Sequence, residues 1–84
     1  MQSNIISLSE LGAGEEGTVI QLHGGNGFVG RMAALGFTPG TTVRVVRNPG
    51  HGALIVSLLD TQIALGRGQA MHVLVSKAAN KSVS

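Results

Sequence analysis

Arg31-Met-Ala-Ala-Leu-Gly-Phe-Thr-Pro-Gly40 decides the fold of this chain, because it encodes the end of a helix followed at once by a tight turn. The apolar side chains around its start recur at the i, i+4 and i+7 spacing of one helix face: Phe28, Met32 and Leu35. Gly36 suits the left-handed residue at which a helix ends. Thr38-Pro39-Gly40 matches a type II turn, in which proline presets φ at the second position and glycine takes a positive φ at the third. The stretch therefore predicts a short helix over residues 27–35, with Asn26 as its N-cap.

On both sides of this helix, short apolar and β-branched runs alternate with turn residues. They predict five strands, over residues 17–22, 41–47, 53–59, 61–65 and 71–75. The run 53–59 is apolar on both faces, so it is expected inside the sheet. Five short strands favour a small closed β-barrel, because closure removes exposed edges. The predicted fold class is all-β, with one short α-helix between the first and second strands.

Smaller signals complete this reading. Ser7 to Glu10 fits a capping box after a loose lead-in over residues 1–6. Residues 66–69 predict a bend. Ile20 is expected to share a face with Leu22, and Met71 to share one with the valines of the last strand. The chain reads as one domain with a core over about residues 7–75 and a flexible tail over 76–84.

Composition narrows the classes of function. The chain has 84 residues, of which 43% are hydrophobic and 12% charged, and it contains no cysteine. A disulfide or thiolate metal site is therefore excluded, and a cytoplasmic location is expected. The longest apolar run, 53–59, is far shorter than the roughly 20 residues that a membrane helix needs. A net charge of +2 predicts only weak attraction to nucleic acid or anionic lipid.

The ordered motifs of the chain resemble those of the FeoA family, small cytosolic proteins of bacterial ferrous iron transport. The resemblance covers about residues 7–75 and is carried by Leu8-x-x-Leu11, Gly14 to Ile20, Arg31-x-x-x-Leu-Gly-Phe-x-Pro-Gly40, Ala64-Leu65 and Ala70-x-x-Val73-x-Val75. It implies an SH3-like barrel that acts in Fe(II) uptake with a membrane ferrous iron permease and its GTPase domain. Asp60, Gly66 and Gln69 depart from the family pattern of a turn glycine, an arginine and an acid. Asp tolerates left-handed φ, so the turn at Asp60 is expected to survive.

Other kinds of site are poorly supported. The G-x-G-x-x-G run over 25–30 opens a helix that is too short, in a chain too small for a dinucleotide fold. The histidines His23, His51 and His72 lack the spacing of metal ligands, so no cofactor or metal is predicted. No ordered catalytic motif occurs, which indicates a protein that is not an enzyme. The alternative left open is a stand-alone barrel that binds metal, or nucleic acid through Arg44, Arg47 and Arg67.

The helix over 27–35 is the remaining candidate site. Its predicted partner-binding residues are Phe28, Arg31, Met32 and Leu35, because an apolar helix face can dock in a groove of another protein. Methionine suits such adaptable surfaces. By the resemblance, the expected partner is the cytosolic GTPase region of the permease, which the protein would modulate. On this hypothesis Met32→Asp abolishes binding and leaves the fold intact, and self-association is a further option.

Overall fold

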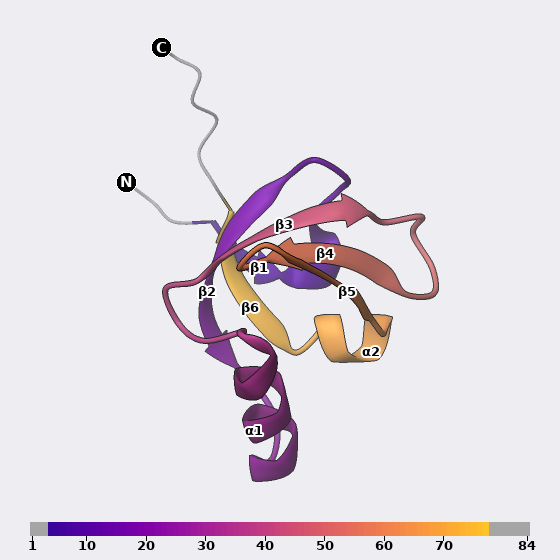
Figure 1. Ribbon diagram of the computed structural model, residues 1–84. Helices are drawn as coiled ribbons and strands as arrows, with labels where there is room; N and C mark the ends of the chain where they lie inside the picture. The colour runs from indigo at the N-terminus through magenta and orange to yellow at the C-terminus, as the bar shows by residue number, and fades with distance from the viewer. Residues whose placement is uncertain (1–3, 78–84) are drawn as a thin grey trace.

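The computed structural model describes residues 4–77, which form six strands, two α-helices and one turn of 3₁₀-helix (Figure 1). The strands are β1 (Ile5–Ser7), β2 (Glu16–Leu22), β3 (Thr42–Arg47), β4 (Leu54–Leu58), β5 (Thr61–Leu65) and β6 (Val73–Lys77). The helical segments are the 3₁₀ turn η1 (Leu8–Glu10), α1 (Asn26–Leu35) and α2 (Arg67–Ala70).

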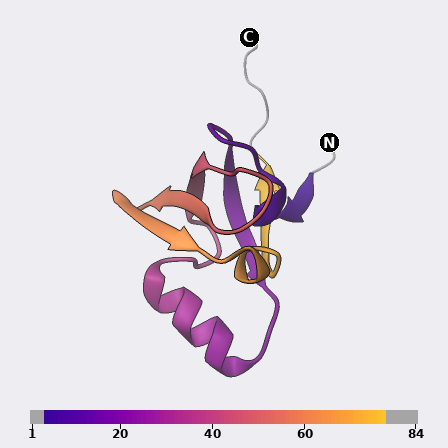
Figure 2. The same ribbon diagram turned by 90° about the vertical axis from the view of Figure 1, so that its right-hand side faces the viewer.

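The strands form one antiparallel sheet that curls around a single core (Figure 2). Its order is β1-β6-β2-β3-β4-β5, so β3, β4 and β5 follow as a meander and β6 returns between β1 and β2. This arrangement confirms the all-β class, with α1 between the first two predicted strands. Within residues 4–77 the order ends at β1 and β5, so the barrel is not closed by a hydrogen-bonded ladder between these two strands.

Strand β1 was not among the five predicted strands. Residues 1–6 were expected as a loose lead-in, but Ile5–Ser7 pairs with β6 and Ile6 lies opposite Val75. Three residues are too few to show an alternating pattern, so only the distant partner strand specifies them. β6 extends to Lys77, beyond the predicted core limit of residue 75, and Lys77 N–H donates to Asn4 O at 2.9 Å. The rest of the predicted tail, 78–84, lies outside the described residues.

The core is aliphatic, with Phe37 as its largest member. Its buried residues come from η1, the sheet, both α-helices and the segment after α1: Leu8, Leu11, Val19, Met32, Phe37, Val43, Val45, Leu54, Val56, Leu58, Leu65, Ala70, Val73 and Val75. Met32 and Phe37 are both fully buried and flank the end of α1. They anchor that end of the helix to the sheet.

The predicted end of α1 is confirmed. Gly36 adopts φ 109°, and its N–H donates to Ala33 O at 3.0 Å. Phe37 N–H donates to Met32 O at 3.0 Å, which completes the Schellman pattern of a helix stop. The following turn is also as predicted, because Gly40 has φ 95° and Thr41 N–H donates to Thr38 O at 3.0 Å.

The predicted start of α1 was one residue too late. Gly25 is the N-cap, and its carbonyl accepts from Val29 N–H at 3.0 Å. Asn26 is therefore the first helical residue, and no side chain caps the helix. The capping box at Ser7 was also wrong, because Ser7 makes no side-chain bond to the backbone of η1. Its hydroxyl instead lies 2.7 Å from Ser9 Oγ.

Two predicted strand faces were wrong at one position each. The register of β2 against β6 shifts between Val19 and Gln21, and this bulge leaves Ile20 40% exposed beside the fully buried Val19. Met71 is 56% exposed because it is the C-cap of α2 and precedes β6. The bend predicted over 66–69 overlaps α2, a single helical turn.

A polar tie joins three segments that are distant in sequence. Asn48 Nδ2 donates to Leu11 O at 2.7 Å and to Ser9 O at 3.1 Å. Arg67 Nη2 donates to Asn48 Oδ1 at 2.6 Å, and Arg67 Nε donates to Gly52 O at 3.1 Å. Asn48 and Arg67 therefore hold the β3–β4 loop between η1 and α2.

Glu15 anchors the turn before β2. Its carboxylate accepts from Gly12 N–H at 2.7 Å and lies 3.0 Å from Lys77 Nζ. The backbone hydrogen bond from Gly12, followed by the interaction with Lys77, lowers the pKa of Glu15 below its ordinary value of 4.5. Glu15 thus ties the turn before β2 to the C-terminal end of β6.

Replacing Met32 tests the anchoring of α1. Met32→Ala should lower the free energy of unfolding by about 2–5 kcal/mol, because it leaves a cavity in the core. Met71→Ala is the matched control, because Met71 is 56% exposed and its loss should change the free energy of unfolding by about 0.5 kcal/mol or less. Urea unfolding followed by circular dichroism measures both. Equal stability of the two variants would show that Met32 does not anchor the helix.

Replacing Glu15 tests its lowered pKa. Because the folded state favours the charged form, the carboxylate stabilises the fold above about pH 4.5, and this contribution disappears as the pH falls through the lower folded pKa. Glu15→Gln should therefore be less stable than the unsubstituted protein at neutral pH and approach it in acid. Chemical unfolding across this pH range measures the difference. Parallel pH profiles for the two proteins would contradict the assignment.

Candidate functional site

Helix α1 stands away from the curled sheet and is joined to it at its C-terminal end (Figures 1 and 2). Of the predicted partner-binding residues, Arg31 and Leu35 are exposed, Leu35 to 43%. Phe28 is half-buried against the edge of the core. Met32 is fully buried. It lies at the centre of the helix face that meets the sheet, so the prediction that its side chain is an exposed contact was wrong, and Met32→Asp would place a charge in the core.

A leucine from another element extends the exposed surface beside Leu35. Leu59 and Asp60 form the β4–β5 turn with φ 51° and 64°, the left-handed pair typical of a type I′ hairpin. The turn at Asp60 survives, as expected, without glycine. Leu59 is 71% exposed, and a Cβ built on Gly36 would lie 3.0 Å from its Cδ1. The side chain of Leu59 thus lies against the end of α1.

We name Arg31, Leu35 and Leu59 the helix-end patch. Arg31 and Leu35 share a face of α1 at the i, i+4 spacing, and Leu59 contacts the next residue, Gly36. Within residues 4–77 Arg31 forms no ion pair. Leu59 was not among the predicted site residues, although its place directly before the turn residue Asp60 indicates an exposed apolar side chain.

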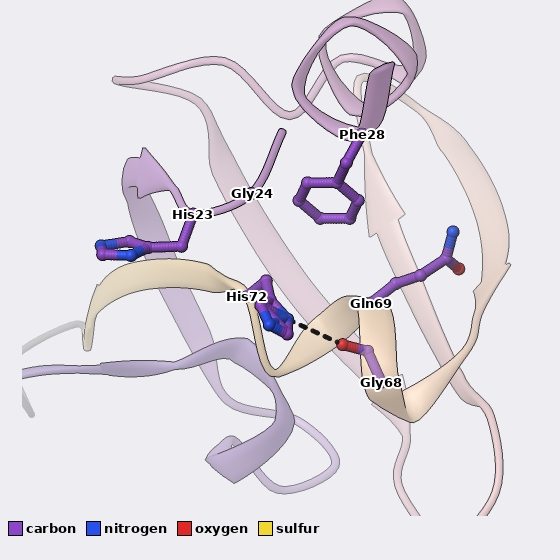
Figure 3. Close-up of a pocket in the computed structure, with 6 residues that line it drawn as sticks. All are labelled: His23, Gly24, Phe28, Gly68, Gln69 and His72. Atoms are coloured by element: carbon purple, nitrogen blue, oxygen red, sulfur yellow. Dashed lines mark hydrogen bonds between the residues drawn. The ribbon is translucent and has the colours of Figure 1, made fainter. Parts of the chain in front are cut away.

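A pocket of about 300 Å³ lies at the other end of α1, between α1 and α2 (Figure 3). It is lined by His23, Gly24, Phe28, Gly68, Gln69 and His72. The rings of Phe28 and His72 meet edge to face, with centroids 6.0 Å apart and planes at 67°. Gly24 passes so close to Phe28 that a Cβ built on it would lie 2.7 Å from Phe28 Cδ2.

The polar groups of this pocket are partly committed to its own walls. His72 Nδ1 lies 3.2 Å from Gly68 O (Figure 3), so in the neutral ring Nδ1 donates and Nε2 is left as an acceptor. Gln69 Oε1 accepts from Gly66 N–H at 3.2 Å, which caps α2 and leaves the amide nitrogen of Gln69 as a donor. Two of the three residues that depart from the family pattern, Gly66 and Gln69, therefore form an uncharged cap of α2.

The structure brings two of the three histidines together. His23 N–H donates to His72 O at 2.8 Å across the ends of β2 and β6, whereas His51 lies in the β3–β4 loop. Within residues 4–77, no group of three or more His, Asp or Glu side chains is placed to hold a metal ion. Arg67 is engaged with Asn48 and Gly52, so it does not join a basic cluster with Arg44 and Arg47.

Comparison with known proteins identifies the family. A model of the FeoA domain matches residues 6–77. The chain belongs to the FeoA family. It is therefore a member of a family of accessory proteins of Fe²⁺ transport, as the motifs indicated. No helix within the described 4–77 is both long and apolar enough to cross a membrane.

Individual relatives agree with this assignment. The chain is 37% identical over 65 residues to a Methanocaldococcus jannaschii protein named "Putative Fe(2+) transport protein A", an alignment that covers 77% of this chain and 78% of that protein. A crystal structure described as the iron uptake regulatory protein FeoA superposes with a TM-score of 0.85 at 33% identity, over 89% of this chain and all of the other (100%). The zinc complex of Stenotrophomonas maltophilia FeoA, described as a procaryotic SH3 domain protein, gives a TM-score of 0.75 at 32% identity, over 84% and 89% of the two chains. The predicted SH3-like fold is confirmed.

Replacing Gly24 tests how the start of α1 is held in this FeoA-family protein. Gly24→Ala should destabilise the protein by about 1–3 kcal/mol, because the new Cβ forces Phe28 out of its place beside His72. Gly27→Ala is the control, since a Cβ there meets nothing within 4 Å and alanine favours a helix. Urea unfolding gives the stabilities, and chemical shifts of the His72 ring report on the stacking. Unchanged His72 shifts in Gly24→Ala would contradict this close packing.

Proposed function

We propose that this protein docks through its helix-end patch on the cytosolic GTPase region of a membrane ferrous iron permease and modulates that permease. Membership in the FeoA family supports a role in Fe²⁺ transport, and the resemblance of the sequence motifs to that family suggests the permease as partner. In this proposal the protein acts in the cytoplasm as a binding partner and not as an enzyme. Docking requires no bound metal or cofactor.

The observation that carries the proposal is the exposure of Leu59 against Gly36, at the end of α1 that carries Leu35. Leu59 is 71% exposed. Its backbone is also left-handed, a conformation that costs a branched aliphatic residue about 1–2 kcal/mol. Its side chain lies against Gly36, but most of its surface remains in solvent. A partner that covers both leucines would gain less than the roughly 1.5–3 kcal/mol of a fully exposed side chain from each, because both are already partly covered.

Arg31 adds a charged group to this apolar contact surface. Its charge lies one helical turn from Leu35 on the same face of α1 and is exposed to solvent. A charge at the rim of an interface mainly accelerates association and limits the choice of partner. An acidic group on the permease is the expected counterpart of Arg31.

The pocket beside Phe28 gives the same helix a second contact. Gly68 and Gln69 of α2 form its opposite wall, and its lining is mostly apolar. A partner segment that runs along α1 from the helix-end patch would reach this pocket and place a side chain in it. Modulation then requires that the permease bind this protein better in one of its conformations than in another, since only such a difference shifts their populations.

Replacing Leu35 tests the docking surface. Leu35→Lys should weaken binding to the purified cytosolic GTPase domain of the permease at least about tenfold, because it puts a charge in the centre of the buried contact. Val46→Lys is the matched control, since Val46 on β3 is 41% exposed and Leu35 43%. Isothermal titration, with and without a GTP analogue, measures both affinities, and circular dichroism confirms that both variants are folded. Equal affinities for the two variants would exclude the helix-end patch as the docking surface. No binding by the unsubstituted protein would exclude the GTPase domain as the partner.

A further inference from the structure

Strand β5 is an edge of the sheet whose outer side is unpaired. It pairs with β4 through five consecutive residue pairs, Leu54↔Leu65 to Leu58↔Thr61, without a bulge. Within residues 4–77, no second strand pairs with β5, and no turn or loop backbone bond reaches residues 61–65. Figure 2 shows β5 at the outer end of the sheet.

The register of the hairpin identifies the free backbone groups. In a two-residue hairpin the residues next to the turn bond to each other, so Thr61 faces β4, and the direction alternates along the strand. The N–H and C=O groups of Gln62 and Ala64 therefore point outward. Both side chains are exposed as well. The backbone groups of these two residues are thus free to form hydrogen bonds with another extended strand.

This edge lacks the usual protection against strand addition. Proteins commonly interrupt an open edge with lysine, proline or a bulge. Residues 61–65 contain no charged residue and no proline. The opposite end of the sheet, β1, is only three residues long, so β5 is the longer free edge of the described chain.

We propose that β5 pairs antiparallel with β5 of a second copy, around a two-fold axis at Ile63. In this register Gln62 lies opposite Ala64 of the second copy. The two residues then form a reciprocal pair of backbone N–H···O=C hydrogen bonds. A large and a small side chain then face each other, and no like charges are opposed. The interface is the same on both copies, as two-fold symmetry requires.

The charge of Asp60, next to β5, favours the same register. Asp60 comes to lie opposite the uncharged Gly66 of the second copy. Parallel pairing would instead place Asp60 beside Asp60. A second copy is thus a better match for this edge than an arbitrary extended peptide.

The dimer is expected to be weak. One strand pair buries far less than the roughly 1,200 Å² of a typical stable interface. Self-association should therefore appear only as the concentration rises. The dimer uses the backbone edge of β5 and not the side chains of the helix-end patch, so its failure would leave the permease hypothesis intact.

Two double variants test the pairing by sedimentation equilibrium over a range of concentrations. Gln62→Lys/Ala64→Lys should raise the dissociation constant of the dimer at least about tenfold, because lysines then face lysines across the axis. Gln62→Lys/Ala64→Glu should restore dimerisation, because each lysine then faces a glutamate of the second copy. Gln21→Lys/Thr42→Lys, on the exposed side of interior strands, adds the same charge and should leave the dimer unchanged.

Amide hydrogen exchange locates the interface in the unsubstituted protein. Exchange at Gln62 and Ala64 should slow as the concentration rises, whereas the amide of Ile63, which faces β4, should not change. A protein that stays monomeric, or a dimer that survives Gln62→Lys/Ala64→Lys, would overturn the proposal. Failure of the lysine–glutamate variant to restore the dimer would overturn the antiparallel register.

Discussion

The left-handed stop at Gly36 is the constraint on which the rest of the molecule depends. It turns the chain sharply between Met32 and Phe37, and both side chains enter the core from either side of it. Because α1 is fixed at this end, Arg31 and Leu35 are held at the surface, and Leu59 lies against Gly36. Burial of Met32 thus determines which other side chains of the helix remain available to a partner.

Much of the fold was predictable because its signals are local. The helix stop, the Thr38-Pro39-Gly40 turn and the strands over 42–47, 54–58 and 61–65 follow from residues that prefer one backbone conformation. The family resemblance was confirmed over almost the same residues. The features that were missed depend on distant partners. β1 is a strand only because β6 lies beside it. The contact of Arg67 with Asn48 crosses the fold, so the sequence left open a basic surface that would include Arg67.

The candidate site was likewise predictable where it depends on local sequence and not where it depends on distant contacts. Helical spacing correctly placed Phe28, Met32 and Leu35 on one face, but it did not show which of them the sheet would cover. Which of the three side chains is buried depends on where the helix axis meets the sheet. In the structure it is the central one, Met32. Leu59 and the pocket beside His72 were not found because each combines elements separated by many residues. The structure therefore replaces a methionine contact with a surface built from two elements.

The pairing of β1 with β6 bears on how the chain reaches this fold. Ile6 and Val75 lie at opposite ends of the described chain, so their pairing closes a loop that contains nearly all the other elements. Such a contact loses chain entropy before it gains any stabilisation, which makes it a late and slow event in folding. During synthesis the N-terminal strand must wait until residues 73–77 leave the ribosome. Until then, β2 also lacks β6 as a neighbour, and the half-formed sheet exposes apolar surface that other nascent chains can bind.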